Sequence, residues 1–146
     1  MSETAVHIVC PHCDAVNRIP ADKPAQAAKC GRCHRSIFEG KPVDVDAVRL
    51  EKNIRDNDIP VVVDFWAPWC GPCRMMAPAY ARAAAQLEPK VRLLKVDTQN
   101  NPAAAEKYNI QAIPTLMLFR GGRTVDRLSG ALDERSLQQW IMRHVA

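Results

Sequence analysis

The spacing of apolar residues changes several times along the chain, and each change predicts a different element. The run 61–67 is rich in β-branched and aromatic residues and predicts a buried strand. The runs 91–96 and 115–119 predict two more strands. After the first run, apolar residues recur every three or four positions, which predicts one face of a helix over 74–87. The positions expected on that face are Cys73, Met76, Ala77, Tyr80, Ala84 and Leu87.

Three shorter helices are predicted after Asp46, Asn101 and Asp133. Each of these residues can start a helix, and each is followed by apolar residues at helical spacing. A Gly-Gly turn at 121–122 predicts a hairpin that joins 115–119 to a strand at 124–128. This order of elements requires both parallel and antiparallel pairs, so we expect an α/β fold with a mixed central sheet flanked by helices. The residues expected to face its core from the shorter helices include Ala47, Leu50, Ile54, Ala105, Tyr108, Leu137, Trp140 and Ile141.

The first 41 residues have a different pattern. They offer two short strand candidates, 6–9 and 17–20, and few large apolar residues. A unit of about 40 residues usually needs a metal, disulfides or a partner to fold. Gly40-Lys41-Pro42 is the best boundary, so we expect two units, 1–41 and 43–146.

Six cysteines form three Cys-x-x-Cys pairs, and two of these pairs lie in the N-terminal unit. Sixteen residues separate them, which is the spacing of a four-cysteine zinc site closed by two facing turns. We therefore expect one structural Zn²⁺. Two disulfides, or replacement of a cysteine by His7, His12 or His34, are the alternatives. The expected ligands are Cys10, Cys13, Cys30 and Cys33.

Composition adds limits to this interpretation. The chain of 146 residues is 47% apolar and 25% charged, with a formal charge of +4 that four zinc-bound thiolates would lower to +2. Residues 1–43 would then be neutral, a poor basis for nucleic-acid binding. No secretory signal is visible at the start, and no apolar run approaches the ~20 residues that span a bilayer. We expect a monomer with no membrane partner. Its expected compartment is the cytoplasm, where thiols stay reduced.

The third cysteine pair, Cys70 and Cys73, follows the first predicted strand and opens the long helix. Unpaired N–H groups and the positive end of the helix dipole would favour the thiolate of Cys70. A thiol pKa near ~8.5 leaves only a few per cent ionised at pH 7, whereas a pKa of about 7 ionises roughly half. Pro72 suits a first helical turn, and Gly71 leaves the approach to Cys70 open. The pair could also be a structural disulfide or half of a metal site.

Residues 64–73, DFWAPWCGPC, closely resemble the signature of the thioredoxin family. Ile113-Pro114-Thr115 and Gly130-Ala131 stand where that family has further landmarks. The resemblance covers 43–146, and with the four-cysteine unit the chain is similar to the zinc-bearing bacterial subtype called thioredoxin 2. The resemblance implies a thioredoxin fold preceded by a small zinc ribbon.

The resemblance also implies roles for individual residues. Cys70 would be the exposed nucleophile and Cys73 the resolving thiol. Asp64 would be a buried carboxyl with a raised pKa that exchanges a proton with Cys73, and Lys95 would lie near Asp64 and modulate it. Pro114 would follow a cis peptide bond. The residues expected to bind substrate are Trp69, Gly71, Pro72, Ile113, Pro114 and Gly130; those interpreted as packing are Met75, Met76, Trp140 and Met142.

The function that the resemblance implies is reduction of disulfides in substrate proteins, with an NADPH-dependent flavoprotein, thioredoxin reductase, as the electron donor. No organic cofactor is expected on the chain itself. Two other functions stay open. The ribbon could recruit a protein or nucleic acid, although only Phe38 is aromatic in 1–41. Oxidation of the zinc thiolates could also release the metal and regulate the redox unit.

Overall fold

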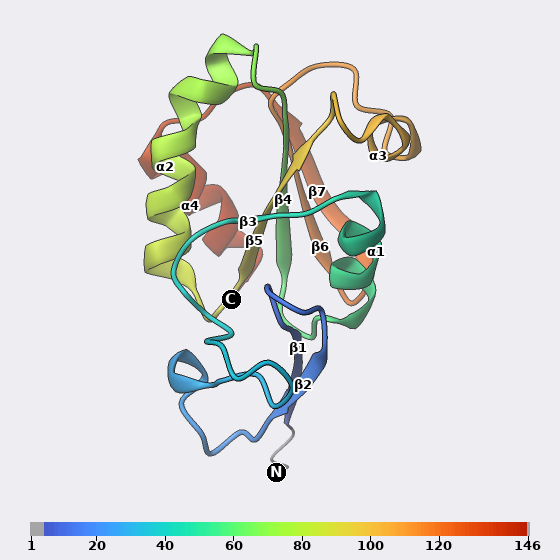
Figure 1. Ribbon diagram of the computed structural model, residues 1–146. Helices are drawn as coiled ribbons and strands as arrows, with labels where there is room; N and C mark the ends of the chain where they lie inside the picture. Colours follow the sequence, from blue (N-terminus) through green and yellow to red (C-terminus); the bar gives the residue numbers. More distant parts are fainter. Residues whose placement is uncertain (1–4, 146) are drawn as a thin grey trace.

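A five-stranded mixed sheet forms the centre of the larger unit in the computed structural model, which describes residues 5–145 (Figure 1). The strand order is β3-β5-β4-β6-β7. The strands β3, β5 and β4 pair in parallel, whereas β6 is antiparallel to both of its neighbours, β4 and β7. The sheet confirms the predicted mixture of pairings. Its strands are β3 (Val43–Asp44), β4 (Val61–Trp66), β5 (Arg92–Asp97), β6 (Thr115–Arg120) and β7 (Arg123–Ser129).

Helices cover both faces of this sheet (Figure 1). The helices α2 (Gly71–Leu87) and α4 (Glu134–Arg143) lie on one face, and α1 (Ala47–Asp56) and α3 (Pro102–Lys107) lie on the other. Asp46 accepts a hydrogen bond from the N–H of Arg49, and Asp133 accepts one from Ser136, so both predicted caps are confirmed.

Alternation along β4 decides which side chains meet which helices. Val61, Val63 and Phe65 belong to the apolar cluster shared with α1 and α3, whereas Val62 belongs to the cluster shared with α2 and α4. Asp64 follows the same alternation as Val62, so its carboxyl is directed to the face that α2 covers. This placement brings a charged group under the helix that carries the cysteines.

Several details differ from the sequence predictions. The helix α2 begins at Gly71 rather than at 74, and Ala79 and Ala83 are buried on it while Ala77 is only partly so. In α3 the buried residue is Ala104, and Ala105 is partly exposed. The two-residue strand β3 was not predicted, because so short an edge strand has no periodicity of its own. Residues 1–4, where no secretory signal was expected, lie outside the described residues.

The N-terminal unit is a small ribbon built on the antiparallel strands β1 (Val6–Val9) and β2 (Val16–Ile19). A short 3-10 turn, η1 (Ala25–Ala27), precedes the second pair of cysteines. Its apolar cluster is small and includes two of the four cysteines. The buried members are Ile8, Cys10, Ile19, Cys30, Ile37 and Phe38.

A buried arginine of β5, paired with Glu88, joins the sheet to the ribbon. The guanidinium of Arg92 binds the Glu88 carboxylate at 2.9 Å and the carbonyl of Ile37 at 2.9 Å, and it lies over the ring of Phe38. Desolvation raises the pKa of Glu88 and lowers that of Arg92, against the attraction between them. Nearby, the buried side chain of Asn57 accepts from the N–H of Val9 at 2.8 Å. The predicted boundary at 41–43 stays a prediction.

Candidate dithiol site and metal centre

Cys70 and Cys73 form a disulfide at the N-terminus of α2, with their Cα atoms 5.3 Å apart. Cys70 is the N-cap residue, and its Sγ accepts a hydrogen bond from the N–H of Cys73 at 3.2 Å. A sulfur at this position receives a helix N–H group and the positive end of the helix dipole, both of which stabilise a thiolate. The predicted place of the pair at the start of the helix is confirmed.

The prediction that Cys70 is exposed is wrong for this oxidised form. Cys70 is only 4% exposed and Cys73 only 2%, because the disulfide packs against the loop before β6. The Sγ of Cys70 lies 3.7 Å from the carbonyl oxygen of Ile113. Two large apolar side chains near the pair in sequence are exposed, Trp69 at 67% and Met75 at 81%, so Met75 is not a packing residue.

Asp64 is buried, with 1% exposure, and its Oδ1 has no hydrogen-bond partner among the described residues. Desolvation raises its pKa from 3.8 to about 7, and the charge of Lys95 opposes this rise. The predicted raised pKa is confirmed. A carboxyl of this acidity is half protonated near neutral pH, which suits it to accept or donate a proton.

Lys95 pairs with Asp64 across β4 and β5, so the two residues are neighbours in the sheet. Its ammonium lies 4.4 Å from the centre of the Trp66 ring, a cation–π arrangement. The predicted proximity of Lys95 to Asp64 is therefore confirmed, whereas a role in turnover stays a prediction.

The loop before β6 completes the site. The Ile113–Pro114 peptide bond is cis, as the resemblance implies. The carbonyl of Pro114 accepts a hydrogen bond from the N–H of Gly130 at 2.8 Å. Gly130 has a φ of +102°, which L side chains rarely adopt. Trp69 and Ile113 line one hollow of about 280 Å³ beside the disulfide.

Gly71 and Pro72 occupy the first turn of α2, directly beside the disulfide. A Cβ added at Gly71 would meet no atom within 4 Å, and Pro72 is exposed. The structure thus leaves this turn open to an approaching molecule, and a substrate-binding role for the two residues stays a prediction.

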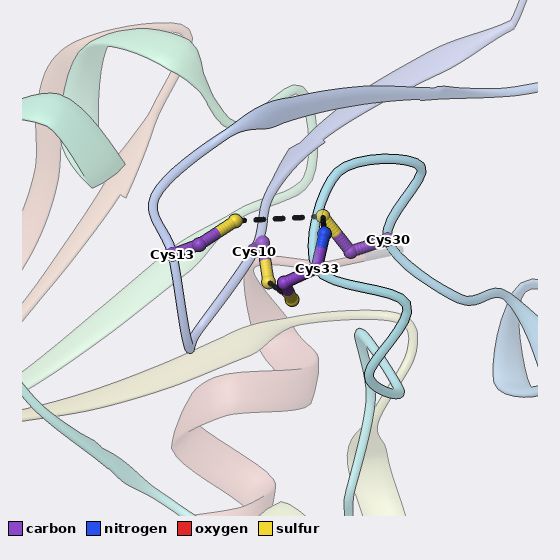
Figure 2. A group of neighbouring side chains, drawn as sticks. All are labelled: Cys10, Cys13, Cys30 and Cys33. Atoms are coloured by element: carbon purple, nitrogen blue, oxygen red, sulfur yellow. Dashed lines mark hydrogen bonds between the residues drawn. The ribbon is translucent and has the colours of Figure 1, made fainter.

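The four cysteines of the ribbon converge on one point (Figure 2). Their Sγ atoms all lie within 4.8 Å of one another, with 3.6 Å between Cys10 and Cys33 and 3.5 Å between Cys13 and Cys30. Tetrahedral zinc with Zn–S bonds of ~2.3 Å needs sulfurs roughly 3.8 Å apart. The four cysteines are free rather than paired in disulfides, so the geometry fits a closed four-sulfur metal site.

Local interactions favour the thiolate of Cys30, whereas burial disfavours the thiolate of Cys10. The Sγ of Cys30 accepts from the N–H groups of Arg32 and Cys33 and from the side-chain amide of Asn17. Burial opposes ionisation of Cys30, but these donors outweigh it and lower the pKa to about 5. The Sγ of Cys10 accepts from the N–H of His12, but burial outweighs this donor and raises the pKa of Cys10. Thiolates are the form that binds Zn²⁺, so the donors around Cys30 suit the metal.

The nearby histidines do not join this cluster. His7 contacts Asp58 at 3.0 Å and His12 contacts Glu39 at 3.0 Å, and the cluster of possible ligands in the described residues contains cysteines alone. The alternative of a histidine ligand is therefore not supported.

Sequence reasoning missed two polar residues that support the sites. Asn17 links the ribbon strands to the loop of Cys30, since it also accepts from the N–H of Gly31 at 2.9 Å. Tyr80 is fully buried under the sheet, and its hydroxyl lies 2.6 Å from the carbonyl oxygen of Leu94. Asn17 gave no signal beyond a polar residue in a strand, and Tyr80 was recognised only as an inward position.

Comparison with known proteins agrees with this geometry. A family profile described as Thioredoxin matches residues 41–143, and one described as Thioredoxin 2, N-terminal, matches 9–35. Thioredoxin C-3 of Corynebacterium nephridii is 42% identical over 92% of each chain. Thioredoxin 1 of Nostoc sp. is 48% identical over 66% of this chain and 90% of its own.

Solved structures give the same result for the fold. A mutant thioredoxin from Halobacterium salinarum matches with a TM-score of 0.67 and 34% identity, over 73% of this chain and 93% of its own. Malassezia sympodialis thioredoxin matches with a TM-score of 0.68 and 32% identity, over 78% of this chain and 99% of its own. Within residues 5–145, none of the helices has the length and apolar character that a bilayer crossing needs.

Proposed function

Because the chain belongs to the thioredoxin family and is a thiol-disulfide oxidoreductase, we propose that it reduces disulfides in substrate proteins through Cys70 and Cys73. The observation that carries the proposal is the disulfide at the N-cap of α2, beside the cis bond before Pro114.

The reaction proceeds by two thiol–disulfide exchanges. The thiolate of Cys70 attacks one sulfur of the substrate disulfide, which forms a mixed disulfide and releases the other substrate sulfur as a thiolate that takes up a proton. Cys73 then loses its proton and attacks the Sγ of Cys70, which releases the second substrate thiol. Because both cysteines belong to one helical turn, the second step is intramolecular and has a high effective concentration.

Asp64 is the proposed proton acceptor for Cys73. It lies on the face of β4 that α2 covers, and its pKa of about 7 lets it exchange protons near neutral pH. Lys95 favours the ionised carboxylate and so keeps part of the Asp64 population ready to accept a proton. Together the two residues would set the pH at which the second exchange is fastest.

The proposed substrate site is the exposed surface around the disulfide. Trp69 and Ile113 line its hollow, and a segment of substrate backbone would lie along the loop of Pro114 and Gly130. Gly71 and Pro72 leave the first turn of α2 open on the other side. Since Cys70 is only 4% exposed, attack on the oxidised form requires a partner that fits this surface closely.

Each turnover leaves the protein as a disulfide, so two electrons must return to it. We propose an NADPH-dependent flavoprotein, thioredoxin reductase, as their source, and the cytoplasm as the compartment, because free zinc-binding thiols persist under reducing conditions. A single structural Zn²⁺ would be held by Cys10, Cys13, Cys30 and Cys33. When bound, the ion supplies four bonds that fix the ribbon.

The test is insulin reduction driven by dithiothreitol, followed by turbidity. Cys70→Ser should abolish the activity, and Cys73→Ser should accumulate a mixed disulfide with substrate. Zinc content and melting temperature of both variants serve as controls for folding. Normal turnover by Cys70→Ser would overturn the proposed function.

A second candidate function is regulation by oxidation of the ribbon. Cys13 and Cys33 are partly exposed, and each lies within 3.6 Å of its sulfur neighbour across the site. Peroxide could convert the four thiolates to two disulfides, with release of zinc and reduction of peroxide to water. Zinc release and insulin reduction should then change together. Retention of zinc at a peroxide concentration that oxidises Cys70 and Cys73 would contradict this regulation.

A further inference from the structure

The ribbon carries a pocket of about 260 Å³ that the redox chemistry does not use. It lies between β2 and the segment that leads from η1 to the second pair of cysteines. Its floor is apolar, with the buried side chains of Ile19 and Ile37 and the wall residues Pro24 and Ala27. Figure 1 shows the ribbon at the opposite end of the molecule from the start of α2, so an occupant here would leave the disulfide accessible.

Three basic side chains surround this apolar floor. Arg18, Lys23 and Lys29 all line the pocket and are exposed, and no acidic residue lines it. Among residues 5–145, none of the three lies within ion-pair distance of a carboxylate. Asp22 does not line this pocket, although it shares a neighbouring hollow with Arg18. The rim is therefore positively charged and free to receive an anionic group.

The walls of the pocket are held by the cysteine loops. The N–H of Ile37 binds the carbonyl of Ala28 at 3.1 Å, and Asn17 on β2 binds both the N–H of Gly31 and the sulfur of Cys30. Since a formed metal site fixes the Cys30 loop, it also fixes the shape of the pocket. The pocket is thus a property of the folded ribbon rather than of the basic residues alone.

We propose that this pocket binds an acidic segment of a partner protein, with one apolar side chain on the Ile19–Ile37 floor and flanking carboxylates on Arg18, Lys23 and Lys29. Charge complementarity selects the acidic residues, and the apolar floor selects a segment that also carries a large aliphatic or aromatic side chain. Nucleic acid fits less well, because no aromatic residue lines the pocket to stack on a base.

The proposal is tested by fluorescence anisotropy with the zinc-loaded full chain and a labelled peptide of glutamates around one central leucine. Binding should weaken with added salt, since exposed charges are screened. The double variant Arg18→Glu with Lys23→Glu should bind about tenfold more weakly, because two attractions become repulsions. Ala27→Trp, which fills the pocket, should abolish binding. Lys41→Glu with Lys90→Glu, an equal charge change at two exposed residues outside the pocket, is the matched control and should bind normally.

Four results would overturn the proposal. Equal weakening by the control variant Lys41→Glu with Lys90→Glu would mean a diffuse charge effect without a site. Equal binding of a peptide with serine in place of the leucine would remove the apolar anchor. Tighter binding of a single- or double-stranded oligonucleotide than of the peptide would assign the surface to nucleic acid. Zinc content is measured for every variant, and binding that survives removal of zinc would also contradict a pocket built by the folded ribbon.

Discussion

The ribbon and the larger unit contain the same Cys-x-x-Cys spacing and use it for different chemistry. In both places a sulfur accepts backbone N–H groups from its own turn: Cys30 from Arg32 and Cys33, and Cys70 from Cys73. In the ribbon, two such turns face each other and four sulfurs meet. In the larger unit, a single pair opens a helix and its two sulfurs bond to each other. The neighbours of the motif, rather than the motif, decide between metal binding and redox chemistry.

The two units also differ in what stabilises them. The larger unit buries an apolar cluster on each face of its sheet, whereas the ribbon has one cluster that includes two of its cysteines. A core that small contributes little by itself, so we expect the ribbon to need a metal bound to its four cysteines for much of its stability. The joint through Arg92 and Glu88 connects the units, and its variants measure how far one depends on the other.

The largest expected effect is that of zinc removal. Zinc binding to such sites contributes ~10–16 kcal/mol, so a chelator should unfold the ribbon while the five-stranded sheet persists. Amide hydrogen exchange would then become fast in β1 and β2 and stay slow in β4 and β6. Unfolding of the whole chain on chelation would contradict two separately stabilised units.

The second largest effect is expected from breaking the buried pair of Arg92 and Glu88. Glu88→Ala leaves the guanidinium of Arg92 buried without its carboxylate, which should cost about 3–5 kcal/mol of unfolding free energy. Urea denaturation measures the loss. Lys107→Ala, which breaks the exposed pair with Glu51, is the control and should cost less than about 1 kcal/mol. The double variant Glu88→Gln with Arg92→Met should recover most of the loss, and equal costs for the buried and exposed pairs would rule out a buried joint.

Asp64→Asn should stabilise the larger unit in a pH-dependent way. Because burial raises the pKa of Asp64 to about 7, the folded state holds its proton more tightly than the unfolded chain does. Stability therefore falls as pH rises from ~4 to ~7, by roughly 4 kcal/mol in total. Asparagine does not ionise and so removes this loss. The variant should therefore gain the most stability above pH 7 and none at pH 4.

Urea denaturation of the oxidised protein at both pH values checks this. Asp126→Asn is a control that should change stability in the opposite direction. Hydrogen bonds from Arg127 and Trp140 lower the pKa of Asp126, so the stability that its carboxylate contributes is lost as pH falls. A pH-independent gain for Asp64→Asn would contradict the raised pKa.

The smallest predicted effect concerns the second contact between the units. Asn57→Ala removes the acceptor for the N–H of Val9 and should cost about 1–3 kcal/mol. Exchange of the Val9 amide should accelerate, while that of β4 is unchanged. The exposed Asn100→Ala serves as the control, and unaltered protection at Val9 would show that the contact contributes nothing to docking.

The sequence by itself determined most of the elements, the mixed sheet and the four cysteines that meet, because hydrophobic periodicity, capping residues and ligand spacing are local properties. Tertiary structure alone decided the rest. Burial under α2 raised the pKa of Asp64, and packing against Ile113 covered Cys70 while leaving Met75 exposed. The joint at Arg92 and the basic pocket also depend on contacts between distant segments. Such contacts have no local signature, since solvation and packing depend on which segments the fold brings together.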